Sequence, residues 1–184
     1  MPPRLPPKIT ATYLENAALH YLERFASSSA NLRRVLMRKA DRSLAHWGGD
    51  RDEAAALVAG LLAKLARLGY LDDAAYARQK AAGLHRRGAS ARAARAKLAA
   101  KGVEAGLVEA ALAEEGGDFA AAVNLARRRR LGPFRPAAAR AERRDRDLAA
   151  LARAGFDFET ARRVVDAADP GSLEDEVAAE AGGR

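Results

Sequence analysis

Apolar side chains that recur every three or four residues, between breaks that contain glycine, constrain this chain more than any other feature of its sequence. From about residue 10 to 26 the apolar positions at this spacing are Leu14, Ala18, Tyr21, Leu22 and Phe25. Such a spacing lines one face of an α-helix. No segment shows the two-residue alternation of a half-buried strand, and isoleucine and threonine, which favour strands, are scarce. We therefore predict an all-α protein.

Nine helices are expected from this spacing. The second begins after the serines at 27–29, whose hydroxyls can cap it, and the third begins after Asp50 or Asp52. Glycines mark most of the later breaks, so the remaining helices are expected at about 72–87, 90–101, 104–115, 118–131, 136–154 and 157–168. Because aromatic residues make up only 5% of the chain, the core is expected to be thin and spread along these helices.

A weak internal repeat divides the nine helices into three groups of three. Residues 33–43, 95–105 and 148–158 each end a helix at a comparable point. One group, of roughly 50 residues, would bury little apolar surface by itself, so neighbouring groups are expected to pack end to end in an elongated, curved array. The expected modules are residues 10–69, 70–117 and 118–168, preceded by a disordered proline-rich leader (1–9) and followed by an acidic flexible tail (169–184).

Three breaks place glycine directly before a large apolar residue, namely Gly69-Tyr70, Gly102-Val103 and Gly155-Phe156. Glycine readily adopts the left-handed conformation that ends a helix, and the apolar side chain after it can fold back onto the last turn. Asp72 or Asp73 is expected to accept hydrogen bonds from the free N–H groups that start the next helix, and Ser90 is assigned the same role for helix 90–101. We interpret these residues as structural caps.

The sequence has no recognisable catalytic, cofactor-binding or metal-binding arrangement. Cysteine is absent, which excludes disulfides, thiolate zinc sites and cysteine nucleophiles. None of the three histidines, His20, His46 and His85, stands three or four residues from another, as a helical metal site would require. Asp72 and Asp73 have no nearby histidine or third carboxylate. We expect no enzymatic activity, cofactor or metal, and a hidden hydrolase is the most distant alternative.

The apolar runs are too short to span a bilayer, and the first ten residues lack the continuous apolar segment of a secretion signal. We therefore expect a cytoplasmic protein without a membrane partner. A monomer is expected, because no exposed apolar patch suited to pairing is apparent.

The formal net charge of +8 favours a polyanionic partner, either nucleic acid or an acidic protein surface. Between Asp73 and Glu104 there is no carboxylate. The candidate binding residues of this stretch are Arg78, Lys80, Arg86, Arg87, Arg92, Arg95, Lys97 and Lys101, and a second group is the run Arg127, Arg128, Arg129 and Arg130. That run either complements the dipole at the end of its helix, in solvent, or contacts a ligand, and both interpretations stay open.

A protein that binds DNA by itself, including a helix-turn-helix reader, is the alternative function. The basic helices are short of Asn and Gln, the side chains that pair with adenine edges. Contact with the backbone of single-stranded or double-stranded DNA, without base reading, is therefore better supported than sequence-specific recognition.

Four segments resemble, in order, the RecX regulators of the RecA recombinase. They are "ALHYLERFASSSANLRRVLMRKA" (18–40), "LARLGYLDDAAYAR" (65–78), "GASARAARAKLAAKGV" (88–103) and "RAGFDFETARRVVD" (153–166), and the similarity extends from about residue 15 to 168. The resemblance implies three tandem three-helix modules. It also implies a non-enzymatic protein that binds the RecA nucleoprotein filament and, in several members, DNA.

The resemblance further implies a mechanism, in which the protein lodges in the groove of the filament. There it would oppose filament growth, ATP hydrolysis, strand exchange and the coprotease activity behind the SOS response. Two features depart from the family pattern. The family usually ends the second helix with Gly where this chain has Ala40, so this helix is expected to continue toward His46. Residues 137–147 match no family motif.

Overall fold

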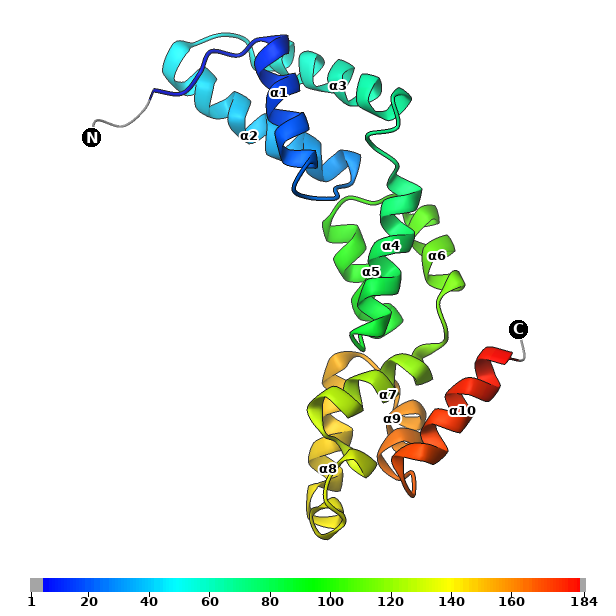
Figure 1. The fold of residues 1–184 in the computed structure, drawn as a ribbon. Helices are drawn as coiled ribbons and strands as arrows, with labels where there is room; N and C mark the ends of the chain where they lie inside the picture. The colour runs from blue at the N-terminus through cyan, green and yellow to red at the C-terminus, as the bar shows by residue number, and fades with distance from the viewer. Residues whose placement is uncertain (1–4, 183–184) are drawn as a thin grey trace. The chain divides into compact units, whose positions relative to one another are not determined.

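The computed structural model describes residues 5–182, which form ten α-helices and one 3-10 turn. In chain order the elements are α1 (Ala11–Leu22), α2 (Ser29–Trp47), α3 (Arg51–Arg67), α4 (Asp73–Arg86), α5 (Ala91–Ala100), α6 (Ala105–Glu114), α7 (Asp118–Arg129), η1 (Gly132–Phe134), α8 (Ala137–Ala154), α9 (Phe158–Val165) and α10 (Pro170–Gly182) (Figure 1). Strands are absent from this range, so the all-α prediction is confirmed. The nine expected helices are present, and α10 is additional.

The internal contacts divide the chain into two compact units. Unit 1 comprises the chain up to Ala77 together with Lys101–Glu104, and unit 2 comprises Arg78–Ala100 and the chain from Ala105 onward. Lys101–Glu104 belongs to unit 1 because this short segment after α5 contacts the start of α2. The division into three modules and the curved array stay predictions.

The core of unit 1 lies among α1, α2 and α3. Its least exposed members, each at most 1% exposed, are Leu14, Ala18, Leu32, Leu36, Val58 and Leu65. Leu14 and Ala18 belong to the apolar stripe predicted for residues 10–26, and the other four recur at helical spacing within α2 and α3. The first stripe is shorter than expected, because α1 ends at Leu22 and Phe25 is 55% exposed.

The second helix continues past Ala40, as expected, and ends at Trp47, after which Gly48 has a φ of 72°. The indole Nε1 of Trp47 donates a hydrogen bond of 2.7 Å to the carbonyl oxygen of Pro6, and Ile9 packs against the core of unit 1. Residues 5–9 therefore contact the first unit, contrary to the prediction of a disordered leader. Residues 1–4 of that leader lie outside the described part of the chain.

The end of α3 corrects one cap prediction. Gly69 has a φ of 77°, its N–H donates to Ala66, and the N–H of Tyr70 donates to the carbonyl oxygen of Leu65. This pair of bonds is the Schellman motif. The side chain of Tyr70 does not fold back, however, since it is 58% exposed, and Leu71, at 5% exposed, is the residue buried in the core.

Two further glycines show why these positions exclude other residues. Gly155 ends α8 with a φ of 99°, and the side chain of Phe156 after it is buried. Gly102 has a φ of 73°, and a Cβ atom there would lie 2.6 Å from the Cβ of Ala30. Gly102 thus allows both a left-handed turn and a close approach to α2.

The adjacent aspartates act on different helices. Asp72 caps α4, because its Oδ1 accepts a hydrogen bond of 2.8 Å from the N–H of Ala75. Asp73 does not cap α4. Its Oδ1 accepts a bond of 2.7 Å from the N–H of Ser29, the first residue of α2. A residue expected to act locally therefore connects two helices that are far apart in sequence.

Asp73 belongs to a hydrogen-bonded joint of unit 1, which also contains Ser28 and Lys101 and connects the start of α2 to the start of α4 and to the turn after α5. The hydroxyl of Ser28 accepts a bond of 3.2 Å from the N–H of Asn31, which caps α2, and it donates a bond of 2.6 Å to the carbonyl oxygen of Lys101. The N–H groups at the start of a helix and the carbonyl groups at its end have no hydrogen-bond partner within that helix. Here they are the first N–H groups of α2 and the carbonyl group of Lys101 in the turn after α5. One serine and one aspartate satisfy three of these groups.

Unit 2 contains the same joint. The hydroxyl of Ser90 accepts from the N–H of Ala93 at 3.2 Å and donates to the carbonyl oxygen of Ala154 at 2.8 Å, while Asp118 Oδ1 accepts from the N–H of Ala91 at 2.7 Å. Each residue corresponds in role to one in unit 1. The weak sequence repeat therefore has a counterpart in a repeated hydrogen-bond pattern.

The prediction of a flexible tail is wrong for residues 170–182, which form α10. Leu173 is 1% exposed within the core formed by α7, α8 and α9. Arg163, whose guanidinium carbon lies 3.7 Å from the centroid of the Phe119 ring, also forms ion pairs with Glu176 and Glu180. These contacts explain why an acidic segment is folded, since its carboxylates have partners on α9.

Residues 137–147, for which the sequence suggests no role, hold unit 2 together. Asp147 is 1% exposed and accepts hydrogen bonds from the N–H of Gly132 (2.8 Å) and from two guanidinium nitrogens of Arg135 (2.7 and 2.8 Å). Arg144 forms a bidentate pair with Asp166, the residue that ends α9, at 2.7 Å for each bond. The charged residues of this segment thus attach α8 to η1 and α9.

Candidate nucleic-acid interface

Five basic side chains line a cleft in unit 2 whose lining contains no acidic residue. The cleft has a volume of about 450 Å³, and its lining residues are Leu84, Arg87, Gly88, Ala89, Ala93, Lys97, Leu125, Arg128, Arg129, Arg153 and Ala154. They come from the end of α4 and the turn after it, from α5, from the second half of α7 and from the end of α8. Leu84 and Leu125 are buried, whereas all five basic residues are exposed.

The turn after α4 lies close against α7 at this cleft. Gly88 ends α4 with a φ of 76°, and a Cβ atom there would lie 2.5 Å from the backbone nitrogen of Leu125. Any other residue would therefore push the two helices apart. Arg128 donates a hydrogen bond to the carbonyl oxygen of Arg87, which holds the end of α7 beside the turn after α4. These contacts place basic residues from two distant sequence segments around one depression.

The charges of the cleft have no acidic partner in the part of the chain that the structure describes. Within residues 5–182, none of the five basic side chains forms an ion pair with a carboxylate. Other arginines of unit 2 do have such partners, as Arg95 has in Glu109 and Arg144 has in Asp166. Like charges held together repel one another, so a bound anion would stabilise this arrangement.

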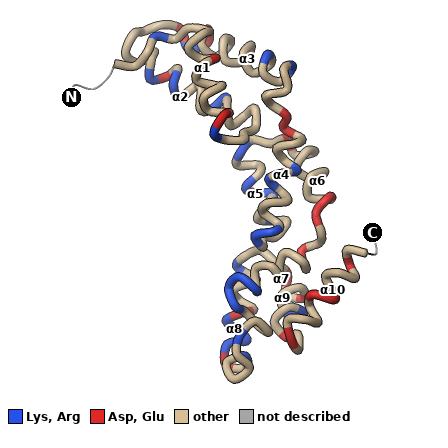
Figure 2. The backbone as a smooth tube through the Cα atoms, in the orientation of Figure 1, with Lys and Arg blue, Asp and Glu red and all other residues tan. Residues whose placement is uncertain are grey.

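The structure brings together part of the predicted binding set. Arg87, Lys97, Arg128 and Arg129 line the cleft, whereas Arg78, Lys80, Arg86 and Arg92 are not part of its lining. Lys101 lies in unit 1, where its backbone carbonyl accepts the hydrogen bond from Ser28. Figure 2 shows the basic positions along α5 and at the end of α7.

Three other predicted residues have structural roles. Arg95 forms a bidentate pair with Glu109, at 2.6 and 2.7 Å, and this hydrogen bonding raises the pKa of Arg95 above its ordinary value. Arg127 pairs with Glu174 of α10 at 2.6 Å. Arg130 has a φ of 55° and ends α7 in the left-handed conformation, as glycine does elsewhere. The contiguous arginine run therefore divides among separate roles.

Arg153, which lies in the last turn of α8 and lines the cleft, is not among the residues predicted from the sequence. A signal was present in the internal repeat. When residues 95–105 are aligned with residues 148–158, Gly102 corresponds to Gly155 and Lys101 corresponds to Ala154. Arg153 therefore lies one position before the residue that corresponds to Lys101. The second basic helix end could thus have been included in the candidate set.

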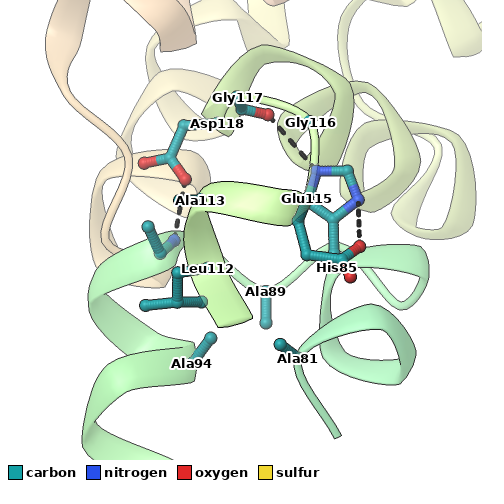
Figure 3. A pocket seen from close by; sticks show the side chains of 11 residues that line it. Ala81, His85, Ala89, Ala94, Leu112, Ala113, Glu115, Gly116, Gly117 and Asp118 are labelled. Carbon is teal, nitrogen blue, oxygen red and sulfur yellow. Dashed lines mark hydrogen bonds and ion pairs between the residues drawn. The ribbon is translucent and has the colours of Figure 1, made fainter. Parts of the chain in front are cut away.

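A second cavity in unit 2, of about 350 Å³, has a different character (Figure 3). Small side chains form much of its wall, and its polar groups bond within the chain. The Nε2 atom of His85 lies 3.3 Å from the carbonyl oxygen of Gly117, its Nδ1 atom lies 4.0 Å from the carboxylate of Glu115, and Asp118 points toward the N–H of Ala91. Two acidic groups make this cavity unsuitable for an anion.

Two other kinds of structural feature are absent from the part of the chain that the structure describes. No group of three or more His, Cys, Asp or Glu residues that could hold a metal ion occurs within residues 5–182. In the same range, no helix combines the length and the apolar character needed to cross a membrane. The cationic cleft is therefore the site whose chemistry is most distinctive.

The fold and the cleft together define a class of protein, an all-helical protein in which basic side chains line a cleft without acidic residues. Comparisons with known proteins then show its family. A family model described as the second three-helix domain of RecX matches residues 72–112. The match covers α4, α5 and most of α6, which supply part of the cleft.

Two curated relatives extend the similarity over most of the chain. A protein of Myxococcus xanthus named "Regulatory protein RecX" is 50% identical over 168 residues, which cover 89% of this chain and 90% of the relative. A protein of the same name from Agrobacterium fabrum is 33% identical over 154 residues, covering 84% of this chain and 82% of the relative. The chain belongs to the RecX family of regulatory proteins.

Proposed function

We propose that this chain is a negative regulator of the RecA recombinase that binds in the groove of the RecA filament on single-stranded DNA. The observation that carries the proposal is the cleft, in which Arg87, Lys97, Arg129 and Arg153 lack acidic partners within the described residues. Phosphate groups are anions spaced regularly along a strand, and clustered Arg and Lys side chains bind them without reading bases. Membership of the RecX family supports RecA as the regulated protein.

The mechanism is occupancy rather than catalysis. A protein seated on the filament through its basic residues would block addition of further RecA subunits and compete with DNA for the groove. Filament growth, ATP hydrolysis, strand exchange and coprotease activity would all decrease together, because each depends on an accessible filament. The protein would act as a cytoplasmic monomer, without a cofactor.

The test is a salt titration of RecA inhibition with two variants matched in charge. The cleft variant replaces Arg87, Lys97, Arg129 and Arg153 by Ala and keeps Arg128, whose side chain also bonds a backbone carbonyl. The control variant replaces four exposed arginines of unit 1, namely Arg24, Arg33, Arg38 and Arg42, by Ala. Both variants lose four positive charges, so net charge alone cannot separate them.

We expect the cleft variant to inhibit RecA ATP hydrolysis weakly and the control variant to inhibit it as the unmodified chain does. Each lost phosphate contact should reduce the slope of log affinity against log salt by about 0.7 on single strands, or about 3 for four contacts. Equal inhibition by both variants would remove the cleft from the interface. Tight duplex binding without any effect on RecA would instead support the stand-alone DNA-binding alternative.

A further inference from the structure

A second surface, with opposite chemistry, lies in unit 1 between α1 and α3. It is an apolar groove of about 700 Å³, lined by Ala11, Leu14, Glu15, Glu53, Ala56, Leu57, Gly60, Leu61 and Lys64. Leu14 and Leu61 form its buried floor, whereas Leu57 is 44% exposed at its edge. A volume of this size accommodates several apolar side chains.

Gly60 is the unusual residue of this groove. It stands in the interior of α3, a helix of 17 residues, where glycine is less favourable to the helix than alanine. A Cβ atom at this position would meet no other atom within 4 Å, so packing inside the protein does not require glycine. Close approach of another backbone from outside is a common physical reason for glycine at such a place.

The charged residues around the groove restrict what can enter it. The Nζ atom of Lys64 is paired with Glu15 at 2.7 Å, so these two charges largely compensate each other. Glu53 adds a second carboxylate to the same lining. The groove is therefore apolar with a net negative edge, and it complements an apolar segment that carries a basic side chain.

We infer that this groove receives an amphipathic helix of the RecA protein, with apolar side chains against Leu57 and Leu61 and a basic side chain near Glu53. A helix laid in an apolar groove is a common mode of recognition, and a small residue in the wall lets the two backbones approach. The inference rests on the proposed function and deepens it, because unit 1 then binds protein while the cleft of unit 2 binds nucleic acid.

Gly60→Phe tests this assignment, because Gly60 lines the groove and the Cβ atom that carries the added ring would meet no other atom within 4 Å. Ala59→Phe is the matched control, since it adds the same ring at an exposed position of α3 that does not line the groove. Helix content and melting temperature of both variants, measured by circular dichroism, show whether each is folded. Binding is then measured to RecA without DNA and, separately, to a labelled single-stranded oligonucleotide.

We expect Gly60→Phe to weaken RecA binding roughly tenfold or more, as loss of a central contact does, while Ala59→Phe and the unmodified chain bind equally. Binding of the oligonucleotide should be the same for all three. Equal RecA binding by the two variants would overturn the groove assignment while leaving the proposed function intact. Failure of the unmodified chain to bind RecA in any form would overturn both. Self-association that Gly60→Phe abolishes would identify a second copy as the occupant and refute the inference.

Discussion

Replacement of Asp147 by Ala should destabilise unit 2 more than any other single substitution of a charged residue on α8. The carboxylate is 1% exposed and accepts three hydrogen bonds, so its removal leaves the N–H of Gly132 and the guanidinium of Arg135 without their acceptor. Removal of one partner from a buried ion pair costs about 3–5 kcal/mol. Because the side chain of Arg135 is 27% exposed and can partly reach water, we expect the lower end, about 3 kcal/mol.

Urea denaturation followed by far-UV circular dichroism measures this loss. With a slope of about 1–3 kcal/mol per molar urea, a loss of about 3 kcal/mol lowers the unfolding midpoint by at least about 1 M. Arg144→Ala is the control, since it removes a bidentate pair with Asp166 whose side chains are 43% and 39% exposed, so it should lower the midpoint much less. A midpoint for Asp147→Ala equal to that of Arg144→Ala would refute the argument that burial makes the first pair essential.

Three further predictions concern single positions. Burial tends to raise the pKa of Asp147, but hydrogen bonds from Arg135 and Gly132 outweigh this effect and hold the pKa below the ordinary 3.8. The unmodified chain should therefore be more stable than Asp147→Asn, with the full difference above about pH 4 and a smaller one as the pH falls through the lower pKa of the folded state. Urea midpoints measured across pH test this prediction. Asp72→Ala should cost about 1 kcal/mol through loss of the α4 cap, and retention of the wild-type melting temperature would contradict this role. Arg130→Gly should raise the melting temperature slightly, because φ is 55° there and glycine removes about 1 kcal/mol of left-handed strain; a lower melting temperature would show that the arginine side chain stabilises the turn.

The positions of the helices could be predicted because their signals are local. Apolar spacing and helix-ending glycines act within a few residues, and the nine expected helices all appear close to their predicted limits. The prediction of a flexible acidic tail is wrong for residues 170–182 because it rests on their charge alone. Leu173 and Val177, four residues apart, carried the helical signal, and both pack against the core. Acidic side chains favour solvent only when no cation of the fold is nearby, and Arg163 supplies one here.

The candidate site could be predicted only in part, because it depends on contacts between distant segments. Nothing local distinguishes Arg95, which has Glu109 as its partner, from Lys97, which lines the cleft two residues later. Likewise, Asp73 looks like a second cap for α4 until the fold brings it to the N–H of Ser29. A carboxylate-free stretch of sequence identifies a region rich in cations, but only the folded arrangement shows which of them remain available.

The arginine run at the end of α7 shows why net charge alone is a weak guide to binding. Arg127 is paired with Glu174, Arg130 turns the chain, and only Arg128 and Arg129 line the cleft. The field that a partner meets is set by the cations left after such internal pairing, because paired charges largely cancel beyond about 10 Å in physiological salt. A formal charge of +8 spread evenly would attract many anions weakly. Concentrated in one cleft, unpaired cations instead favour a partner whose negative charges are equally concentrated, as those of a nucleic-acid backbone are.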